Sequence, residues 1–390
     1  MIIPYGRQTI TQDDIDAVTE VLRSEFLTQG PVVPRFEAAL AAYSGSEFAV
    51  ATNSATSALH LACLALGLGP GDRVWTTPIT FVATANCARY CGAEVDFVDI
   101  DPLTYNMSAD RLEERLIAAA SDGCLPKVVI PVHLCGQSCD MAKIHALSKK
   151  YNFSIIEDAS HAIGGKYLGK QIGGCQYSQI TVFSFHPVKI ITTGEGGAAT
   201  TNDPLLADRM QRLRSHGITR DPAQMTTPPD GPWYYQQIDL GFNYRMTDIQ
   251  AALGLSQLGR LDQYVNKRHS LALEYDRLFI NKPVVVPFQH QDCYSSFHLY
   301  VIRLRLAEMR VGQREIFERL RSNGVMVNLH YIPVYRHPYY AMGRIYFKCP
   351  EAEKYYREVI TLPLYPALDE KILARIVDVM FTPIGHQTIF

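Results

Sequence analysis

Short apolar segments alternate with segments of helical spacing between about residues 46 and 205, and this alternation limits the possible folds. The apolar segments are EFAVAT, DRVWTT, EVDFVDI, PKVVIPVHL and FSIIEDA. Helical spacing of apolar residues occurs between them, over 57–66, 83–91, 109–120 and 141–151. Such alternation predicts a mostly parallel sheet with helices on both faces. QITVFSFHP and GGAATTN then predict two strands joined without a helix, which makes the sheet mixed.

Two helices are expected before this region. Thr11 is a suitable N-cap for the first helix, and a Gly30-Pro31 pair interrupts the chain after it. The apolar residues of that helix recur at helical spacing: Ile15, Val18, Val21 and Leu22. The second expected helix, PRFEAALAAYSG, ends at Gly45.

The pattern changes after about residue 205. Residues 220–235 are rich in proline and polar side chains and predict a long surface loop, and residues 247–279 predict one long helix. The remainder mixes expected strands (SFHLYVIRLRL and VMVNLHYIP) with expected helices at 313–322, 352–359 and 369–380. We therefore expect two domains. Residues 1–255 would form an N-terminal segment and a large α/β domain, and residues 256–390 a linking helix and a smaller α+β domain.

Composition excludes several classes of function. The 390 residues carry a formal net charge of −2, which gives no reason to expect binding to nucleic acid or to an acidic membrane surface. No apolar run approaches the roughly 20 residues that span a bilayer, and the N-terminus has no pattern of a signal peptide. The nine cysteines are scattered, which argues against a disulfide framework. We expect a cytoplasmic protein without membrane contact.

A metal site is one alternative for four residues of types that bind zinc, His133, Cys135, Cys139 and His145. Their spacing matches no structural zinc pattern, and the two cysteines flank a Gly-Gln-Ser turn. We interpret them as core and loop residues and expect no metal.

A lysine follows a buried strand in TVFSFHPVKIITTGEGGAAT. Lys189 has the apolar neighbours Val188 and Ile190 and precedes a Gly-rich turn. A desolvated lysine has a lowered pKa and is a better nucleophile at neutral pH. An ordinary surface lysine is the alternative interpretation.

Two carboxylates end the expected strand in SIIEDASHA, at the edge where parallel sheets bind ligands. Enzymes that use pyridoxal phosphate (PLP) need a carboxylate that keeps the pyridine nitrogen protonated. Side chains alternate along a strand, so Glu157 and Asp158 face opposite sides, and we choose Asp158. A helix cap is the alternative role.

Two further segments at strand ends are suited to a flat, phosphorylated cofactor. ATNSATSALH places small hydroxyl residues before a helix, where they and the backbone N–H groups can hold a phosphate. In TTPITFVATAN, Phe81 follows a strand and can stack on a ring. Each segment alone also suits a structural role. Together with the carboxylate and the lysine, their order along the chain indicates PLP.

Beyond these features, the chain resembles the sugar-nucleotide aminotransferases of the DegT/DnrJ/EryC/StrS group, which are fold-type I PLP enzymes. The resemblance covers nearly the whole chain and rests on FLTQGPVVPRFE, PITFVATANCARYCGAEVDFVDID, PVHLCGQSCDM, IIEDASHAIGG, FSFHPVKIITTGEGGAATTND, LRSHG and LGFNYRMTDIQAALG. SFHPVK followed by TTGEGG is highly specific. The resemblance implies a large, mostly parallel mixed sheet flanked by helices and a smaller C-terminal α+β domain.

The resemblance also implies a role for each matching position. Lys189 would bind PLP covalently, Asp158 would pair with the pyridine nitrogen, and Phe81 would stack on the ring. Asn243 would reach the phosphate of the neighbouring subunit's cofactor, which requires a homodimer with shared active sites. The residues implied to hold the cofactor are Lys189, Asp158, His161, Phe81, Ala55, Thr56, Ser57, Ser184 and Asn243.

Departures from the usual family pattern resemble one branch, the transaminases of the pseudaminic acid pathway. The cradle reads NSATSALH where a Gly-Thr pair is common, and DASHA carries His161 where glutamine is usual. Cys135 replaces a frequent aromatic residue. The residues implied to line the sugar-nucleotide site are Tyr5, Phe26, Leu27, Thr28, His330 and Tyr331. Arg245 is a candidate for binding the carboxylate of glutamate, from its position and charge.

The implied reaction moves the amino group of L-glutamate, through PLP and pyridoxamine phosphate (PMP), to C4 of a UDP-4-keto-6-deoxy-N-acetylhexosamine. UDP-4-keto-6-deoxy-L-AltNAc, on the way to pseudaminic acid, is the preferred substrate hypothesis. The corresponding keto-sugar of GlcNAc is the alternative.

Three other functions are alternatives. A related branch removes a sugar hydroxyl and carries histidine at the lysine position, whereas this chain has Lys189. A non-catalytic PLP-binding regulator would need a basic, DNA-binding surface, which a near-neutral chain does not indicate. A Rossmann dehydrogenase would need GxGxxG after the first strand.

Overall fold

The alternation of strands and helices builds one large sheet in the computed structural model, which describes residues 2–342 and 348–381. Its seven strands are ordered β1 (Phe48–Thr52), β9 (Gly197–Thr201), β8 (Ile180–Ser184), β5 (Ser154–Asp158), β4 (Val128–Ile130), β2 (Arg73–Thr76) and β3 (Glu94–Phe97). β9 pairs antiparallel with β1 and β8, and the other neighbours pair in parallel. The predicted mostly parallel mixed sheet is confirmed.

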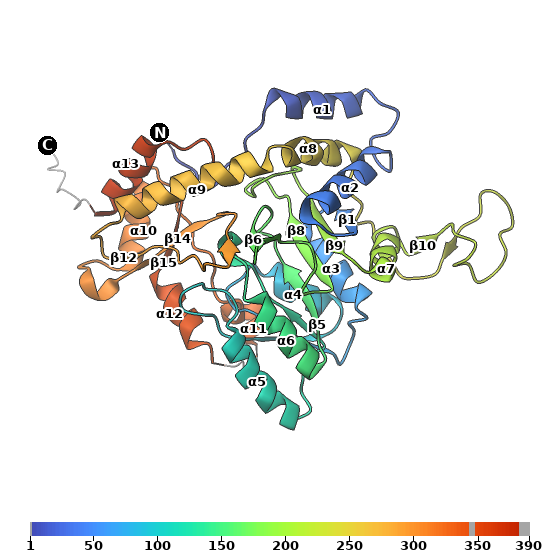
Figure 1. The fold of residues 1–390 in the computed structure, drawn as a ribbon, viewed down its shortest axis with the longest axis horizontal. Helices are drawn as coiled ribbons and strands as arrows, with labels where there is room; N and C mark the ends of the chain where they lie inside the picture. Colours follow the sequence, from blue (N-terminus) through green and yellow to red (C-terminus); the bar gives the residue numbers. More distant parts are fainter. Residues whose placement is uncertain (1, 343–347, 382–390) are drawn as a thin grey trace.

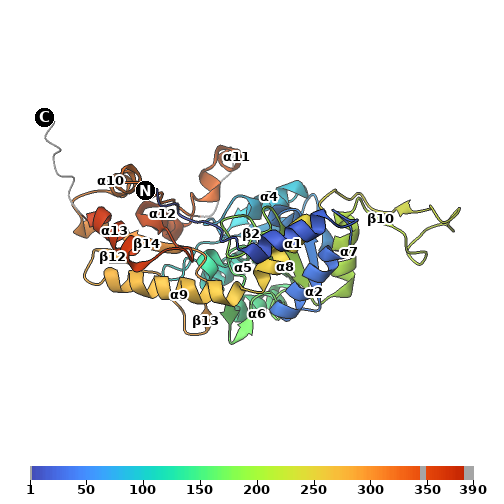
Figure 2. The ribbon, with the colours of Figure 1, turned by 90° about the horizontal axis from the view of Figure 1, so that it is seen from above.

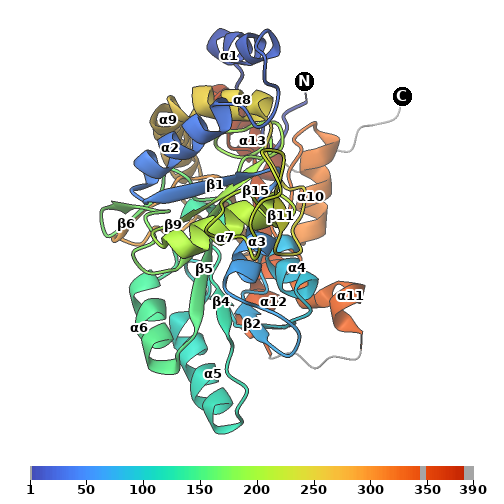
Figure 3. The same cartoon turned by 90° about the vertical axis from the view of Figure 1, so that its right-hand side faces the viewer.

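Helices cover both faces of this sheet because strand residues alternate between two hydrophobic clusters. Val74 and Val128 pack with α3 and α4, whereas Trp75 and Val129 pack with α5 and α6. These helices are α3 (Ala55–Ala65), α4 (Ala83–Tyr90), α5 (Ala109–Ser121) and α6 (Met141–Tyr151). Figure 3 shows α6 and α4 on opposite sides of β5 and β4. Burial on both faces explains why these strands are apolar along their whole length.

The two N-terminal helices lie beside the sheet, as expected. They are α1 (Gln12–Leu22) and α2 (Val32–Ser44). Thr11 is the N-cap of α1, and its backbone N–H donates to the Asp14 carboxylate at 2.9 Å. Gly45 ends α2 at φ 75°, a left-handed conformation that favours glycine. α1 packs on α8 (Asp248–Leu258), α2 packs on α8 and β1, and α7 (Pro204–Arg214) packs on α3.

A smaller antiparallel sheet lies in the C-terminal part, with strands β12 (Val284–Val285), β14 (Tyr300–Leu304) and β15 (Val359–Leu362). Its core includes residues of α9 (Leu261–Leu278), α10 (Gln313–Ser322) and α13 (Glu370–Phe381). Figure 2 shows α9 running from the large sheet towards α13. The remaining short elements are β6 (Lys166–Tyr167), β7 (Lys170–Gln171), β13 (Cys293–Tyr294), α11 (Pro338–Ala341), α12 (Pro350–Glu358) and 3₁₀ turns at Leu134–Gly136, Leu306–Glu308 and Val334–Arg336.

The single helix predicted over residues 247–279 is wrong, because the structure divides it into α8 and α9 at Gly259 and Arg260. Glycine has low helix propensity. The two helices also pack on different layers, α8 on α1 and α2, and α9 on α13. Neither the 18-residue α9 nor any other helix in the described part of the chain has the length and apolar character needed to cross a membrane.

One prediction near the second sheet is also wrong. VMVNLHYIP is not a strand: only Val325 and Asn328 form isolated bridges, and the following residues turn to line a cavity. The helix predicted over 352–359 is confirmed as α12, which ends one residue earlier than expected, at Glu358, because Val359 begins β15. Val359 and its successors are buried in the sheet, so tertiary packing overrides the helical pattern there.

Residues 220–235 lie in the expected surface loop. The short pairing of β10 (Ile218–Thr219) with β11 (Gln236–Gln237), which the sequence did not predict, closes this loop. Figure 1 shows the loop extending away from the large sheet. Trp233 near its end is 73% exposed.

Candidate active site

A cavity of about 580 Å³ lies at the carboxyl ends of β1, β2, β5 and β8. Parallel sheets bind ligands at this edge. Residues 328–331 of the C-terminal part close the cavity on another side. The predicted site residues that line it are Tyr5, Ala55, Thr56, Phe81, Asp158, His161, Ser184, Lys189, His330 and Tyr331.

Lys189 lies in the loop that joins β8 to β9. The backbone N–H of Lys189 donates to the carbonyl of His186 at 2.8 Å, which forms a turn at this point. Burial lowers the pKa of Lys189 from 10.5 to about 8, and the negative charge of Asp158 opposes this shift. A substantial fraction of the amine is therefore neutral near physiological pH, as attack on an aldehyde requires.

Asp158 ends β5, is 4% exposed and borders the same cavity. Its Oδ2 accepts a hydrogen bond from the Thr84 hydroxyl at 2.6 Å, and its Oδ1 accepts one from the Ser160 N–H at 3.1 Å. The Thr80 hydroxyl is 2.8 Å from that of Thr84. Because Thr84 uses its proton on the carboxylate, Thr80 must donate to Thr84. This chain of hydroxyls holds the carboxylate in one orientation.

Glu157 points to the opposite face of the sheet, as strand alternation predicts. Its carboxylate pairs with His133 Nε2 at 2.7 Å and accepts from the Ser178 hydroxyl at 2.5 Å. Burial would raise the pKa of Glu157, but these bonds together with Thr181 lower it overall. Glu157 is therefore a satisfied core residue.

The start of α3 supplies an anion-binding position. Ser54 is the N-cap, and its side chain accepts from the Ser57 N–H at 3.1 Å. Ala55 and Thr56, the first residues of the helix, line the cavity, as does Ser184 at the end of β8. A Cβ at Gly197 would lie 2.3 Å from the Ala55 nitrogen, so only glycine lets β9 approach the helix start this closely. A helix N-terminus with nearby hydroxyls suits a phosphate group.

Two aromatic side chains lie at the opening. Phe81 is 59% exposed, and its ring centroid is 6.2 Å from that of Tyr331. Tyr5 packs near His330, with ring centroids 5.4 Å apart. The exposed face of Phe81 is free to contact a planar ring.

Several predicted site residues do not line this cavity. The Ser57 hydroxyl donates to the Asn53 side chain at 2.6 Å. Phe26 and Leu27 are 50% and 47% exposed, and Asn243 is also exposed. The residues outside the cavity are Phe26, Leu27, Thr28, Ser57, Asn243 and Arg245.

Sequence reasoning missed several residues that line the cavity, among them Thr80, Thr84, Ser160, Glu195 and Asn328. One signal pointed to Thr84: it lies three residues after Phe81 in a segment expected to begin a helix. Its contact with Asp158 spans 74 residues of sequence, and no local pattern predicts such a contact.

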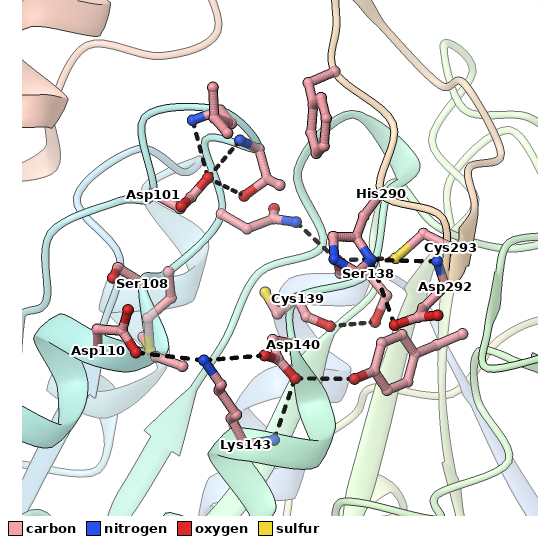
Figure 4. A pocket seen from close by; sticks show the side chains of 17 residues that line it. Asp101, Ser108, Asp110, Ser138, Cys139, Asp140, Lys143, His290, Asp292 and Cys293 are labelled. Carbon is pink, nitrogen blue, oxygen red and sulfur yellow. Dashed lines mark hydrogen bonds and ion pairs between the residues drawn. The ribbon is translucent and has the colours of Figure 1, made fainter.

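Another cavity, of about 260 Å³, lies beside α6 and contains Asp110, Asp140 and Lys143 (Figure 4). The Lys143 ammonium lies 3.5 Å from Asp110 and 4.0 Å from Asp140, so it pairs with both carboxylates. Residues 2–342 and 348–381 contain no cluster of three or more side chains arranged to hold a metal ion.

The groups around Lys189 fit PLP. The amine can bind its aldehyde, the anionic Asp158 lies in the same cavity, and the α3 N-terminus is suited to its phosphate. Gly197 leaves the room that the helix start needs.

Comparison with known proteins agrees with this chemistry. The chain matches the DegT/DnrJ/EryC1/StrS aminotransferase family over residues 8–381. It is 39% identical over 372 residues to the spore coat polysaccharide biosynthesis protein SpsC of Bacillus subtilis, covering 94% of this chain and 93% of that protein. It is 39% identical over 384 residues to the UDP-4-amino-4,6-dideoxy-N-acetyl-beta-L-altrosamine transaminase of Campylobacter jejuni, covering 98% and 97%.

Solved structures of aminotransferases share the fold. PseC of Helicobacter pylori, an aminotransferase involved in the biosynthesis of pseudoaminic acid, superposes with a TM-score of 0.88 at 32% identity, covering 97% of this chain and 98% of that one. Spr1654 of Streptococcus pneumoniae, described as a sugar aminotransferase and solved in its PLP form, gives a TM-score of 0.86 at 30% identity, covering 97% and 98%. The chain therefore belongs to the DegT/DnrJ/EryC1/StrS family and is a PLP-dependent aminotransferase with the fold of the type I enzymes.

Proposed function

We propose that this protein transfers the amino group of L-glutamate to C4 of a UDP-4-keto-6-deoxy-N-acetylhexosamine, with UDP-4-keto-6-deoxy-L-AltNAc as the substrate. The Campylobacter relative named as an altrosamine transaminase and the PseC structure support this choice of sugar. The observation that carries the proposal is the placement of Lys189, with its lowered pKa, in one cavity with Asp158 and the start of α3.

When bound, PLP supplies an electron sink for the carbon that loses a proton. Lys189 holds the cofactor through its Nζ. The free Nζ would take the proton from Cα of the amino donor, and in the second half of the reaction it would return a proton to C4 of the sugar. The Asp158 carboxylate keeps the pyridine nitrogen protonated, and Thr84 orients that carboxylate.

The other predicted residues complete the site. Ser184 at the end of β8 binds the phosphate together with the backbone around Ala55, Thr56 and Ser57 at the start of α3, and Phe81 contacts the face of the ring. His161 borders the cofactor. Tyr5, His330 and Tyr331 bind the sugar nucleotide.

We also propose a homodimer with shared active sites. Asn243, Arg245 and residues 26–28 lie outside the cavity of their own chain but on adjoining segments, since Thr28 bridges Thr247 and Arg245 bridges Thr52. In the dimer this surface faces the cavity of the other subunit. Asn243 then binds the phosphate there, Arg245 binds the carboxylate of glutamate, and Phe26, Leu27 and Thr28 contact the sugar nucleotide.

An absorbance spectrum of the purified protein with PLP tests the proposal. Glutamate should bleach the visible band of the bound cofactor, and UDP-4-keto-6-deoxy-L-AltNAc should restore it. Recovery with the GlcNAc-derived isomer alone would assign the other sugar. Lys189→Ala should show no lysine-dependent band and no turnover, and turnover by that variant would contradict the role of Lys189.

A further inference from the structure

The backbone at Cys135 determines which nitrogen of His161 carries a proton. The Cys135 N–H lies 3.2 Å from His161 Nδ1 and is directed at it. A backbone amide can only donate, so Nδ1 accepts and carries no proton. Cys135 has φ 61° within the turn Leu134–Gly136.

The second nitrogen of His161 must therefore be the donor. His161 Nε2 lies 3.1 Å from the hydroxyl oxygen of Tyr331, and the two rings are nearly parallel, with an interplanar angle of 25°. A neutral imidazole carries one proton, which is on Nε2 and is donated to Tyr331. Burial, with the charge of Lys189 and with His330, lowers the pKa of His161 well below 6.5.

The surroundings of His161 keep this arrangement over a wide pH range. Its titratable neighbours are Lys189, from the β8–β9 loop, and His298 and His330, from the C-terminal part. Burial lowers the pKa of His298 well below 6.5 and that of His330 to about 3, so both histidines are neutral. The charge near His161 at neutral pH is therefore that of Lys189, which disfavours a second proton on the imidazole.

Tyr331 accepts the bond from His161, so its own hydroxyl proton points elsewhere. Tyr331 lines the cavity with Phe81 and Lys189. Burial raises the pKa of Tyr331 well above 10, so the phenol keeps its proton. A phenol whose oxygen already accepts one hydrogen bond can donate its own proton to a ligand.

We propose that Tyr331 is a fixed hydrogen-bond donor for the ketone oxygen of the keto-sugar, and that His161 is a positioning residue that holds Tyr331 in this role. The inference rests on the proposed function for the identity of the ligand. A ketone oxygen only accepts hydrogen bonds, and it gains negative charge as an amine adds to its carbon. A donor directed at it therefore stabilises the reacting state.

The two half-reactions of the PLP-loaded enzyme distinguish this role from a general one. The first is followed as bleaching of the cofactor band by glutamate, and the second as recovery of that band with UDP-4-keto-6-deoxy-L-AltNAc. Tyr331→Phe should slow recovery by about tenfold or more, and bleaching by a smaller factor, because only recovery uses the sugar ketone. His161→Leu should likewise slow recovery more than bleaching. His161→Gln should stay within about threefold of wild type, because an amide can accept from Cys135 and donate to Tyr331 at once.

A double variant tests whether His161 acts through Tyr331. Adding His161→Leu to Tyr331→Phe should slow recovery no further, since the hydroxyl that His161 positions is already gone. If the double variant recovered more slowly than Tyr331→Phe by the full factor seen for His161→Leu alone, the proposal would be overturned, because His161 would then act on another group, such as the cofactor. Equal losses in both half-reactions would also overturn it.

¹⁵N NMR of histidine-labelled holoenzyme provides a readout that does not depend on turnover. His161→Gln identifies the His161 signals by their disappearance. A proton on Nε2 from pH 6 to 8 is the expected result, and a proton on Nδ1 or a charged ring would overturn the positioning role. If glutamate fails to bleach the wild-type enzyme, the proposed function fails, and the NMR result still decides the state of His161.

Discussion

At the scale of single residues, the Lys189 ammonium group destabilises the cofactor-free fold because burial removes it from water. Folding lowers its pKa from 10.5 to about 8, so the unfolded chain binds more protons between these values. The free energy of unfolding should therefore rise with pH across this window, by roughly 3 kcal/mol at most. Below pH 8 the full destabilisation is present.

Urea unfolding of cofactor-free wild type and Lys189→Met measures this effect. The variant should be the more stable protein at pH 7, and its advantage should shrink as pH rises from 8 to 10.5. Lys149→Met, at an exposed position near the end of α6, is the matched control and should show no such trend. A constant difference between Lys189→Met and wild type would contradict the desolvation argument.

A second prediction at this scale concerns Thr84, whose hydroxyl donates to the buried Asp158 at 2.6 Å. Thr84→Val keeps the shape but leaves the carboxylate without that donor, which should cost about 1–3 kcal/mol of stability and weaken PLP binding. Thr84→Ser retains the hydroxyl and should lie close to wild type. Denaturant unfolding and PLP titration measure both effects, and a loss in Thr84→Ser as large as that in Thr84→Val would contradict the role of the hydroxyl.

At the scale of secondary structure, Asp248 joins α8 to α2. Its carboxylate is 0% exposed and accepts from the N–H groups of Gly30 at 2.7 Å, Val32 at 2.7 Å and Val33 at 3.0 Å. It therefore caps α2, whose own N-cap, Pro31, makes no side-chain cap bond.

Asp248→Ala should lower the free energy of unfolding by about 2–4 kcal/mol, since three buried N–H groups lose their acceptor. Asp110→Ala is the control, because Asp110 is an exposed acidic residue in the first turn of α5. Urea denaturation compares the two variants. Equal effects would mean that the carboxylate of Asp248 does not hold α2 in place.

At the scale of the whole molecule, shared active sites predict that two inactive variants restore activity when mixed. Lys189→Ala lacks the cofactor lysine, and Asn243→Ala lacks the group proposed to reach across the dimer. A mixed dimer contains one site with both native groups. Random reassembly of equal amounts, after mild denaturation and refolding together, should restore about one quarter of the native sites.

The turnover of the reassembled mixture, compared with each variant refolded alone, measures this recovery. Absence of recovery, with dimers present by light scattering, would contradict the proposed contribution of Asn243 to the partner's site.

The division into domains at residue 255 stays a prediction.

The local sequence pattern was sufficient to predict much of the structure of this protein. Strand alternation separated Asp158 from Glu157, as the pairing of Glu157 with His133 on the other face bears out. The strand–helix order predicted the large sheet, since each element buries a face whose period is visible in the sequence. The cofactor followed from motifs at strand ends and from the family they resemble.

Tertiary structure alone decided the rest, because those features depend on contacts between distant segments. Residues 247–279 have one helical pattern, yet packing on two layers divides them at Gly259. Residues 325–333 alternate like a strand, yet Val325 and Asn328 form only isolated bridges and residues 328–331 line the cavity. The bonds from Thr84 to Asp158 and from His161 to Tyr331 join residues 74 and 170 positions apart. Periodicity reports which side of an element is buried, and only the folded chain determines which distant group meets it there.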